Sequence, residues 1–146
     1  MPRESIPKMK RNELLEVSSQ TLAYMGDAVY DQYVRTCLVT AFAHESAHVL
    51  HLRATRIVRA SAQAYALMAI YEDLTDEERA VYRRGRNANT ASVPKNADVG
   101  QYRIATGFEA VLGYVYLLGD EARLQTLLTL ARDKGWKEQF QWQGQA

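Results

Sequence analysis

Cysteine, proline and long apolar runs are scarce in this sequence, and each scarcity excludes a class of protein. Cys37 is the only cysteine, so a disulfide framework is excluded and a reducing cytoplasm is the expected location. No apolar run approaches the ~20 residues that span a bilayer, and the first residues form no apolar leader. Three prolines leave no proline-rich linker. We therefore expect a cytoplasmic protein with no membrane partner.

The composition that remains favours one domain with its own core. The chain has 146 residues, of which 47% are hydrophobic, and this is enough for a single core. The formal net charge is only +1, so any nucleic-acid footprint has to come from local clusters of cations. We predict a flexible arm over residues 1–10, a domain over residues 11–135 and a tail over residues 136–146.

Apolar residues recur every three or four positions, as in amphipathic helices, and no segment alternates like a strand. Thr75 and Glu78 form a capping box, and Asp98 with Gln101 can cap a later helix. Residues 88–97 form the one long polar loop. The fold class is therefore all-α, a helical bundle. The predicted helices cover residues 19–38, 44–72 (one helix or two), 76–87, 99–118 and 121–134.

Two carboxylates interrupt apolar helical stretches. Asp27 and Glu109 are each the only acid in such a stretch. A helix that is apolar on every face is usually buried, and a buried carboxylate has to be paired, protonated or bound to a cation. Gly26 and Gly113 are costly inside helices, yet small residues there would let two backbones approach and bring both acids to one ion. Mg²⁺ keeps several waters and needs only one or two carboxylates, so it suits this ligand set.

These acids and a group of histidines also have interpretations without catalysis. A buried aspartate can cap a neighbouring helix or pair with an arginine, and the chain would then be a helical interaction protein. His44, His48 and His51 have a spacing that can hold Zn²⁺ on one helical face. No fourth ligand is evident, which favours a surface or interface role for them.

A basic segment surrounds the polar loop. Between residues 79 and 103 the only acid is Asp98, whereas arginines and lysines recur. Cations at the end of a helix complement its dipole, which is the structural interpretation. The loop adds short polar side chains suited to phosphate oxygens and 2′-hydroxyls, through which double-stranded RNA is mostly recognised. The candidate RNA-binding residues are Arg83, Arg84, Arg86, Asn87, Lys95 and Asn96.

Both apolar stretches resemble the signatures of a known family. Residues 24–29, Tyr-Met-Gly-Asp-Ala-Val, resemble the signature helix of ribonuclease III domains, and residues 108–113, Phe-Glu-Ala-Val-Leu-Gly, resemble the second signature. Residues 84–88, Arg-Gly-Arg-Asn-Ala, together with the segment 94–99 resemble the loop of the Mini-ribonuclease III branch. The resemblance covers nearly the whole chain in the expected order.

The resemblance implies a ribonuclease III-like endonuclease domain that works as a homodimer on duplex RNA, without a separate double-stranded-RNA-binding domain. It implies that Asp27 and Glu109 bind Mg²⁺ and are the catalytic residues, and that hydrolysis leaves 5′-phosphate and 3′-hydroxyl ends. The expected substrate is precursor 23S ribosomal RNA, and a ribosomal protein is a further partner that the resemblance leaves open.

Three positions depart from the larger relatives. Gln20 and Ala23 stand where those enzymes carry acids before the first signature, and Thr106 stands where they carry an aspartate. A hydroxyl cannot replace a carboxylate as a charged ligand, so we expect weak metal binding that depends partly on substrate phosphates. The missing acids also motivate an alternative, a non-catalytic ribonuclease III-like module that binds structured ribosomal RNA.

Overall fold

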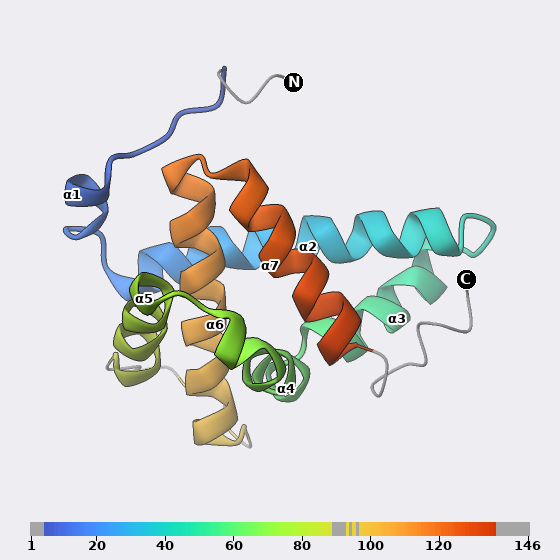
Figure 1. Cartoon of the computed structure of the whole chain (residues 1–146). Helices are drawn as coiled ribbons and strands as arrows, with labels where there is room; N and C mark the ends of the chain where they lie inside the picture. The colour runs from blue at the N-terminus through green and yellow to red at the C-terminus, as the bar shows by residue number, and fades with distance from the viewer. Residues whose placement is uncertain (1–4, 89–92, 94, 96, 137–146) are drawn as a thin grey trace.

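The computed structural model describes residues 5–88, 93, 95 and 97–136, and within these ranges it contains helices and no strand (Figure 1). The all-α prediction is confirmed. None of the described helices has the length and apolarity needed to cross a membrane. A short 3₁₀ helix, Tyr71–Asp73, follows the fourth α-helix. The α-helices are α1 (Arg11–Leu14), α2 (Ser19–Ala41), α3 (Ala47–Val58), α4 (Ala60–Ile70), α5 (Asp76–Asn87), α6 (Val99–Leu118) and α7 (Glu121–Gly135).

Local capping signals position several helix starts. The Thr75 hydroxyl accepts from the Glu78 backbone N–H at 3.1 Å, and the Glu78 carboxylate accepts from the Thr75 N–H at 2.9 Å, so the capping box is confirmed. Asp98 caps α6 by accepting from the Gln101 N–H at 2.9 Å, also as predicted. At the other end of α6, Gly119 has φ 80°, the left-handed conformation that glycine supplies at helix ends.

The helical segment predicted over residues 44–72, as one helix or two, contains two α-helices. The backbone is extended at Arg59 (φ −64°, ψ 156°), which separates α3 from α4. Ser46 caps α3 by accepting from the Val49 N–H, so His44 lies in the turn before the helix. The prediction that His44 shares a helical face with His48 and His51 is therefore wrong, because the serine cap begins the helix after His44.

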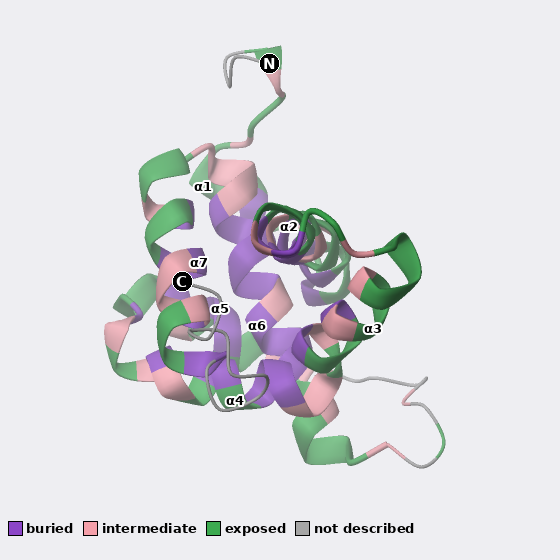
Figure 2. Cartoon of the chain, turned by 90° about the vertical axis from the view of Figure 1, so that its right-hand side faces the viewer, coloured by how far each residue is buried: buried purple, intermediate pink, exposed green. Residues whose placement is uncertain are grey.

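The α6 helix runs through the middle of the molecule and packs against α2, α4, α5 and α7 (Figure 1). Every residue from Ala105 to Val115 is buried except Glu109, which is half-buried. Figure 2 shows this concentration of buried residues on α6. Glu109 is therefore the one partly exposed residue in the buried stretch of α6 from Ala105 to Val115.

Segments at both ends of the described chain contact the bundle. The Met9 N–H donates to the Leu117 carbonyl at 2.7 Å, next to the end of α6. Trp136 is only 1% exposed, and its indole N–H donates to the Tyr30 hydroxyl at 2.9 Å. The rest of the predicted tail, residues 137–146, and residues 1–4 of the predicted arm lie outside the described residues.

Candidate active site

Two glycines let α2 and α6 cross with their backbones in contact. A Cβ atom on Gly26 would lie 1.7 Å from the Glu109 carbonyl oxygen, and one on Gly113 would lie 2.0 Å from the Leu22 carbonyl oxygen. Real Cβ atoms do not approach this closely, so neither position tolerates a side chain at this crossing. The predicted close approach of the two helices is confirmed, and it brings Asp27 beside Glu109.

The two carboxylates differ in exposure. Glu109 is half-buried, whereas Asp27 is exposed, so the prediction that both are buried is wrong for Asp27. The physical reason is that the apolar stretch around Asp27 is not covered on every side. Tyr24, one turn before Asp27, is 82% exposed. An apolar sequence pattern predicts a covered face but does not say whether the same chain supplies the cover.

Burial raises the pKa of Glu109 to about 8, and Asp27 adds to this rise as a hydrogen-bonding partner and as a like charge. A side-chain hydrogen bond from Gln63 acts in the opposite direction. The two acids are thus close enough for each to affect the other's charge, although burial is the larger cause of the rise. In the described part of the chain neither forms an ion pair with an arginine or lysine, so the interpretation as internally paired structural acids lacks its partner cations.

The sequence analysis missed Gln63, a residue of α4 that is only 3% exposed. Its Nε2 donates to Glu109 Oε2 at 3.2 Å and to the Val58 carbonyl at 2.8 Å. The available signal was a lone amide in a helix whose other residues are mostly apolar. Thr106, by contrast, donates its hydroxyl to the Tyr102 carbonyl at 3.0 Å within its own helix, and Gln20 is exposed.

Most of the predicted RNA-binding residues gather at the end of α5. The side chains of Arg83, Arg84, Asn87 and Lys95 are exposed. Arg86 is half-buried, donates to Asn87 Oδ1 at 3.1 Å and lies 5.4 Å above the Tyr82 ring. Asn96 lies outside the described residues.

The basic end of α5 packs directly on the helix that carries Glu109. A Cβ on Gly85 would lie 3.0 Å from Gly107 Cα and 3.2 Å from Ala110 Cβ. The helix therefore contacts α6 on both sides of Glu109 along the chain. This contact places the C-terminal end of α5 against the segment of α6 that carries Glu109.

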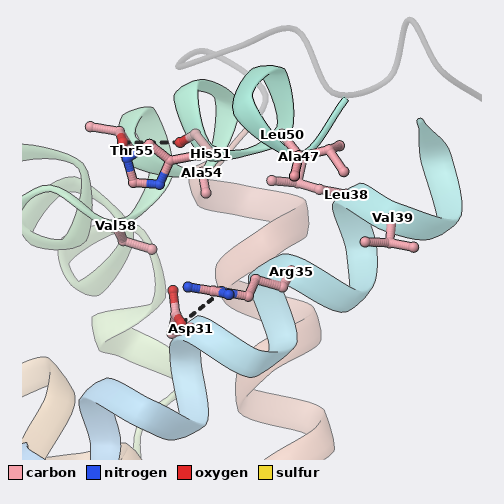
Figure 3. Close-up of a pocket in the computed structure, with 10 residues that line it drawn as sticks. All are labelled: Asp31, Arg35, Leu38, Val39, Ala47, Leu50, His51, Ala54, Thr55 and Val58. Carbon is pink, nitrogen blue, oxygen red and sulfur yellow. Dashed lines mark hydrogen bonds and ion pairs between the residues drawn. The ribbon is translucent and has the colours of Figure 1, made fainter. Parts of the chain in front are cut away.

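A hollow of about 290 Å³ lies between α2 and α3 (Figure 3). Apolar side chains such as Leu38 and Leu50 form much of its lining. At its edge Arg35 Nε pairs with Asp31 Oδ2 at 2.9 Å. Asp31 is thus an acid one turn beyond Asp27 that already has a cation partner, which makes it a matched control for Asp27.

Comparison with known proteins identifies the family. The Ribonuclease III domain matches residues 20–120. The Mini-ribonuclease 3 of a Thermoanaerobacter species is 41% identical over 88% of this chain and 89% of the relative, and that of Enterococcus faecalis is 44% identical over 77% and 86%. A crystal structure of a Fusobacterium nucleatum protein superposes with a TM-score of 0.73 at 25% identity, covering 83% of this chain and 96% of that one.

The chain belongs to the ribonuclease III family, in its Mini-ribonuclease 3 branch. It therefore carries a ribonuclease domain, and the matched range 20–120 contains both signature acids. The fold predicted from the sequence is confirmed at the level of the family.

The residues at the α2–α6 crossing fit a divalent cation of the magnesium type. Two adjacent carboxylates repel one another, and burial beside Asp27 raises the pKa of Glu109, so the ionised pair is costly unless a cation binds between the two acids. Among the described residues no third histidine, cysteine, aspartate or glutamate joins them, and the three histidines form no metal-binding group. An oxygen-only ligand set of one or two carboxylates suits Mg²⁺, which retains waters, and does not suit Zn²⁺.

Proposed function

We propose that this protein is a divalent-metal-dependent endoribonuclease that cleaves double-stranded RNA, with Asp27 and Glu109 as ligands of Mg²⁺. The observation that carries the proposal is the juxtaposition of these two acids at the α2–α6 crossing, where burial and Asp27 raise the pKa of Glu109. When bound, the ion would supply Lewis-acid activation of a water and of the phosphodiester. The chain's own contribution is to fix two carboxylate oxygens at one place.

We propose that the basic C-terminal end of α5 binds the RNA backbone. Exposed guanidinium and amide groups donate to phosphate and 2′-hydroxyl oxygens, which are the groups that A-form duplexes present. The C-terminal end of α5 packs on the segment of α6 that carries Glu109, so RNA held by these cations would pass close to the two carboxylates. The proposed contacts are Arg83, Arg84, Arg86, Asn87, Lys95 and Asn96.

The homodimer is proposed from the resemblance to ribonuclease III domains. Tyr24, which is 82% exposed one turn from Asp27, is the large side chain of α2 that a second copy would cover. A second copy would cover Tyr24 and form one duplex-binding cleft from two chains. The proposed substrate is precursor 23S ribosomal RNA in the cytoplasm, with hydrolysis leaving 5′-phosphate and 3′-hydroxyl ends, and a ribosomal protein as a further partner.

Cleavage of duplex RNA by single-carboxylate variants tests the proposal. With Mg²⁺ we expect Asp27→Asn and Glu109→Gln to lower kcat roughly 10³-fold, which corresponds to about 4 kcal/mol of lost transition-state stabilisation. Asp31→Asn is the matched control, because its carboxylate pairs with Arg35 one turn along the same helix. Cleavage by Asp27→Asn at the rate of the control would overturn the assignment.

The alternative of a non-catalytic module that binds structured ribosomal RNA follows from the small number of ligands. Among the described residues the site offers two carboxylates and no third acidic, cysteine or histidine ligand. Duplex binding without cleavage in either Mg²⁺ or Mn²⁺ would favour this alternative over the nuclease.

A further inference from the structure

The amide of Gln63 joins three helices at the candidate metal site. It projects from α4, and its Nε2 donates both to Glu109 Oε2 on α6, at 3.2 Å, and to the Val58 carbonyl at the end of α3, at 2.8 Å. The side chain is only 3% exposed, so bulk water does not compete for these hydrogen bonds. One carboxylate oxygen of Glu109 is therefore tied to the backbone of another helix through a buried group.

The chemistry of the neighbours fixes the orientation of this amide. Both contacts of Nε2 are acceptors, a carbonyl and a carboxylate, and the NH₂ group has two hydrogens to donate. The flipped amide would place its own oxygen against two other oxygens. The orientation with Nε2 toward Glu109 is thus the one that hydrogen bonding allows.

This arrangement carries a cost to folding. Gln63 Oε1 is buried and has no hydrogen-bond partner in the described part of the chain. An unsatisfied buried polar atom costs about 1–3 kcal/mol, whereas an apolar side chain of the same length would avoid that cost. The benefit of an amide at this position therefore lies in the two hydrogen bonds that Nε2 donates. One goes to the Val58 carbonyl, and the other goes to Glu109, the proposed metal ligand.

We propose that Gln63 is a positioning residue that holds Oε2 of Glu109 so that the carboxylate is pre-oriented for the ion shared with Asp27. The inference rests on the proposed function of the two acids. Hydrogen bonds from outer residues commonly orient metal-binding carboxylates, and removing such a partner typically lowers metal affinity about 10–100-fold. Because its side chain is buried, Gln63 would act on the ion only through Glu109.

Metal binding without RNA tests the role of Gln63 separately from activity. The probe is Mn²⁺, titrated into the full chain and followed by electron paramagnetic resonance. We expect Gln63→Met to weaken Mn²⁺ binding about 10–100-fold, with a Tm close to that of the wild type because the orphaned oxygen is removed together with the hydrogen bonds. Wild-type Mn²⁺ affinity in this variant would overturn the inference.

Leu67→Ala is the matched control for a purely structural effect, since Leu67 lies on the same helix and is fully buried. It should lower the Tm more than Gln63→Met does, because it leaves a cavity, and should leave Mn²⁺ affinity unchanged. If loss of Mn²⁺ affinity instead follows the loss of Tm across both variants, Gln63 is structural and the inference is wrong.

A second variant keeps the inference testable if Gln63→Met does not fold. Gln63→Leu also removes the donor to Glu109 Oε2 and has a different shape, so added Mn²⁺ should raise its Tm by less than it raises that of the wild type. An equal or larger rise would contradict the inference. A wild-type protein that neither binds Mn²⁺ nor cleaves duplex RNA would contradict the proposed function itself.

Discussion

Glu109 and Asp27 show what a sequence pattern says about individual residues. Each interrupts an apolar stretch, and the structure brings the two together at a glycine crossing, as that pattern predicts. The exposure of Asp27 was not predictable, because an apolar stretch has the same sequence whether its outer face meets its own chain or a partner. Gln63 was detectable as a polar residue in an apolar helix, but its contact with Glu109 joins residues 46 apart and leaves no local signal.

The pKa of Glu109 makes a prediction about stability and pH. Its value in the folded protein is about 8, above the ordinary 4.5, so the folded state holds a proton that the unfolded state has lost. The stability contributed by the protonated form is therefore complete below about pH 4.5 and is lost as the pH rises through about 8. We expect the free energy of unfolding of the metal-free protein to fall across this window, measured by denaturant titration.

Glu109→Gln is the control for this pH effect, because its side chain has the same shape and does not titrate. The variant should lose less stability than the wild type over the same pH range. Parallel curves for the two proteins would contradict the raised pKa of Glu109, and with it the burial of this carboxyl beside Asp27.

At the scale of elements, local signals set most helix boundaries. Capping residues such as Thr75 and Asp98 act through groups three positions away, so the sequence alone identifies them. At Arg59, the residue before α4, no side chain caps the helix, so the sequence carries no local signal for this break. The sequence therefore does not decide whether residues 44–72 form one helix or two.

The α2–α6 crossing carries the strongest prediction about packing. Gly26→Ala would place a methyl group 1.7 Å from the Glu109 carbonyl oxygen, and backbone on both sides prevents a cheap adjustment. We expect a loss of about 3 kcal/mol or more in the free energy of unfolding, at the upper end of the usual cost of overpacking. Separation of the helices should also weaken Mn²⁺ binding, since it moves Asp27 away from Glu109.

Gly100→Ala is the matched control for this substitution. Gly100 is exposed in the first turn of α6, and a Cβ there would meet only the Asp98 side chain, at 3.3 Å. Its effect on stability should be small, because alanine has the higher helix propensity. A Gly26→Ala protein as stable as the Gly100→Ala protein would contradict the close crossing.

At the scale of the whole molecule, the proposed homodimer makes a prediction about Tyr24. Tyr24→Glu puts a charge on a side chain that is 82% exposed in one chain and would be buried in a dimer. We expect sedimentation to show a dimer for the wild type and a shift to monomer for this variant. Val99→Glu changes an exposed valine at the start of α6 (47% exposed) and should leave the dimer intact.

A monomeric wild type, or equal association of the Tyr24→Glu and Val99→Glu variants, would contradict the dimer. Neither side chain belongs to the core, so each variant should still fold. We expect the two variants to have similar Tm values when both are measured as monomers. Loss of association in Tyr24→Glu is then a property of the surface and not of folding.

Anomalous diffraction at the manganese absorption edge, from crystals soaked in Mn²⁺, determines whether a cation occupies the α2–α6 crossing. The expected result is one strong peak within coordination distance of carboxylate oxygens from both Asp27 and Glu109, which is absent in crystals of Glu109→Gln. Peaks elsewhere on the molecule with none between these two acids would contradict a shared metal site.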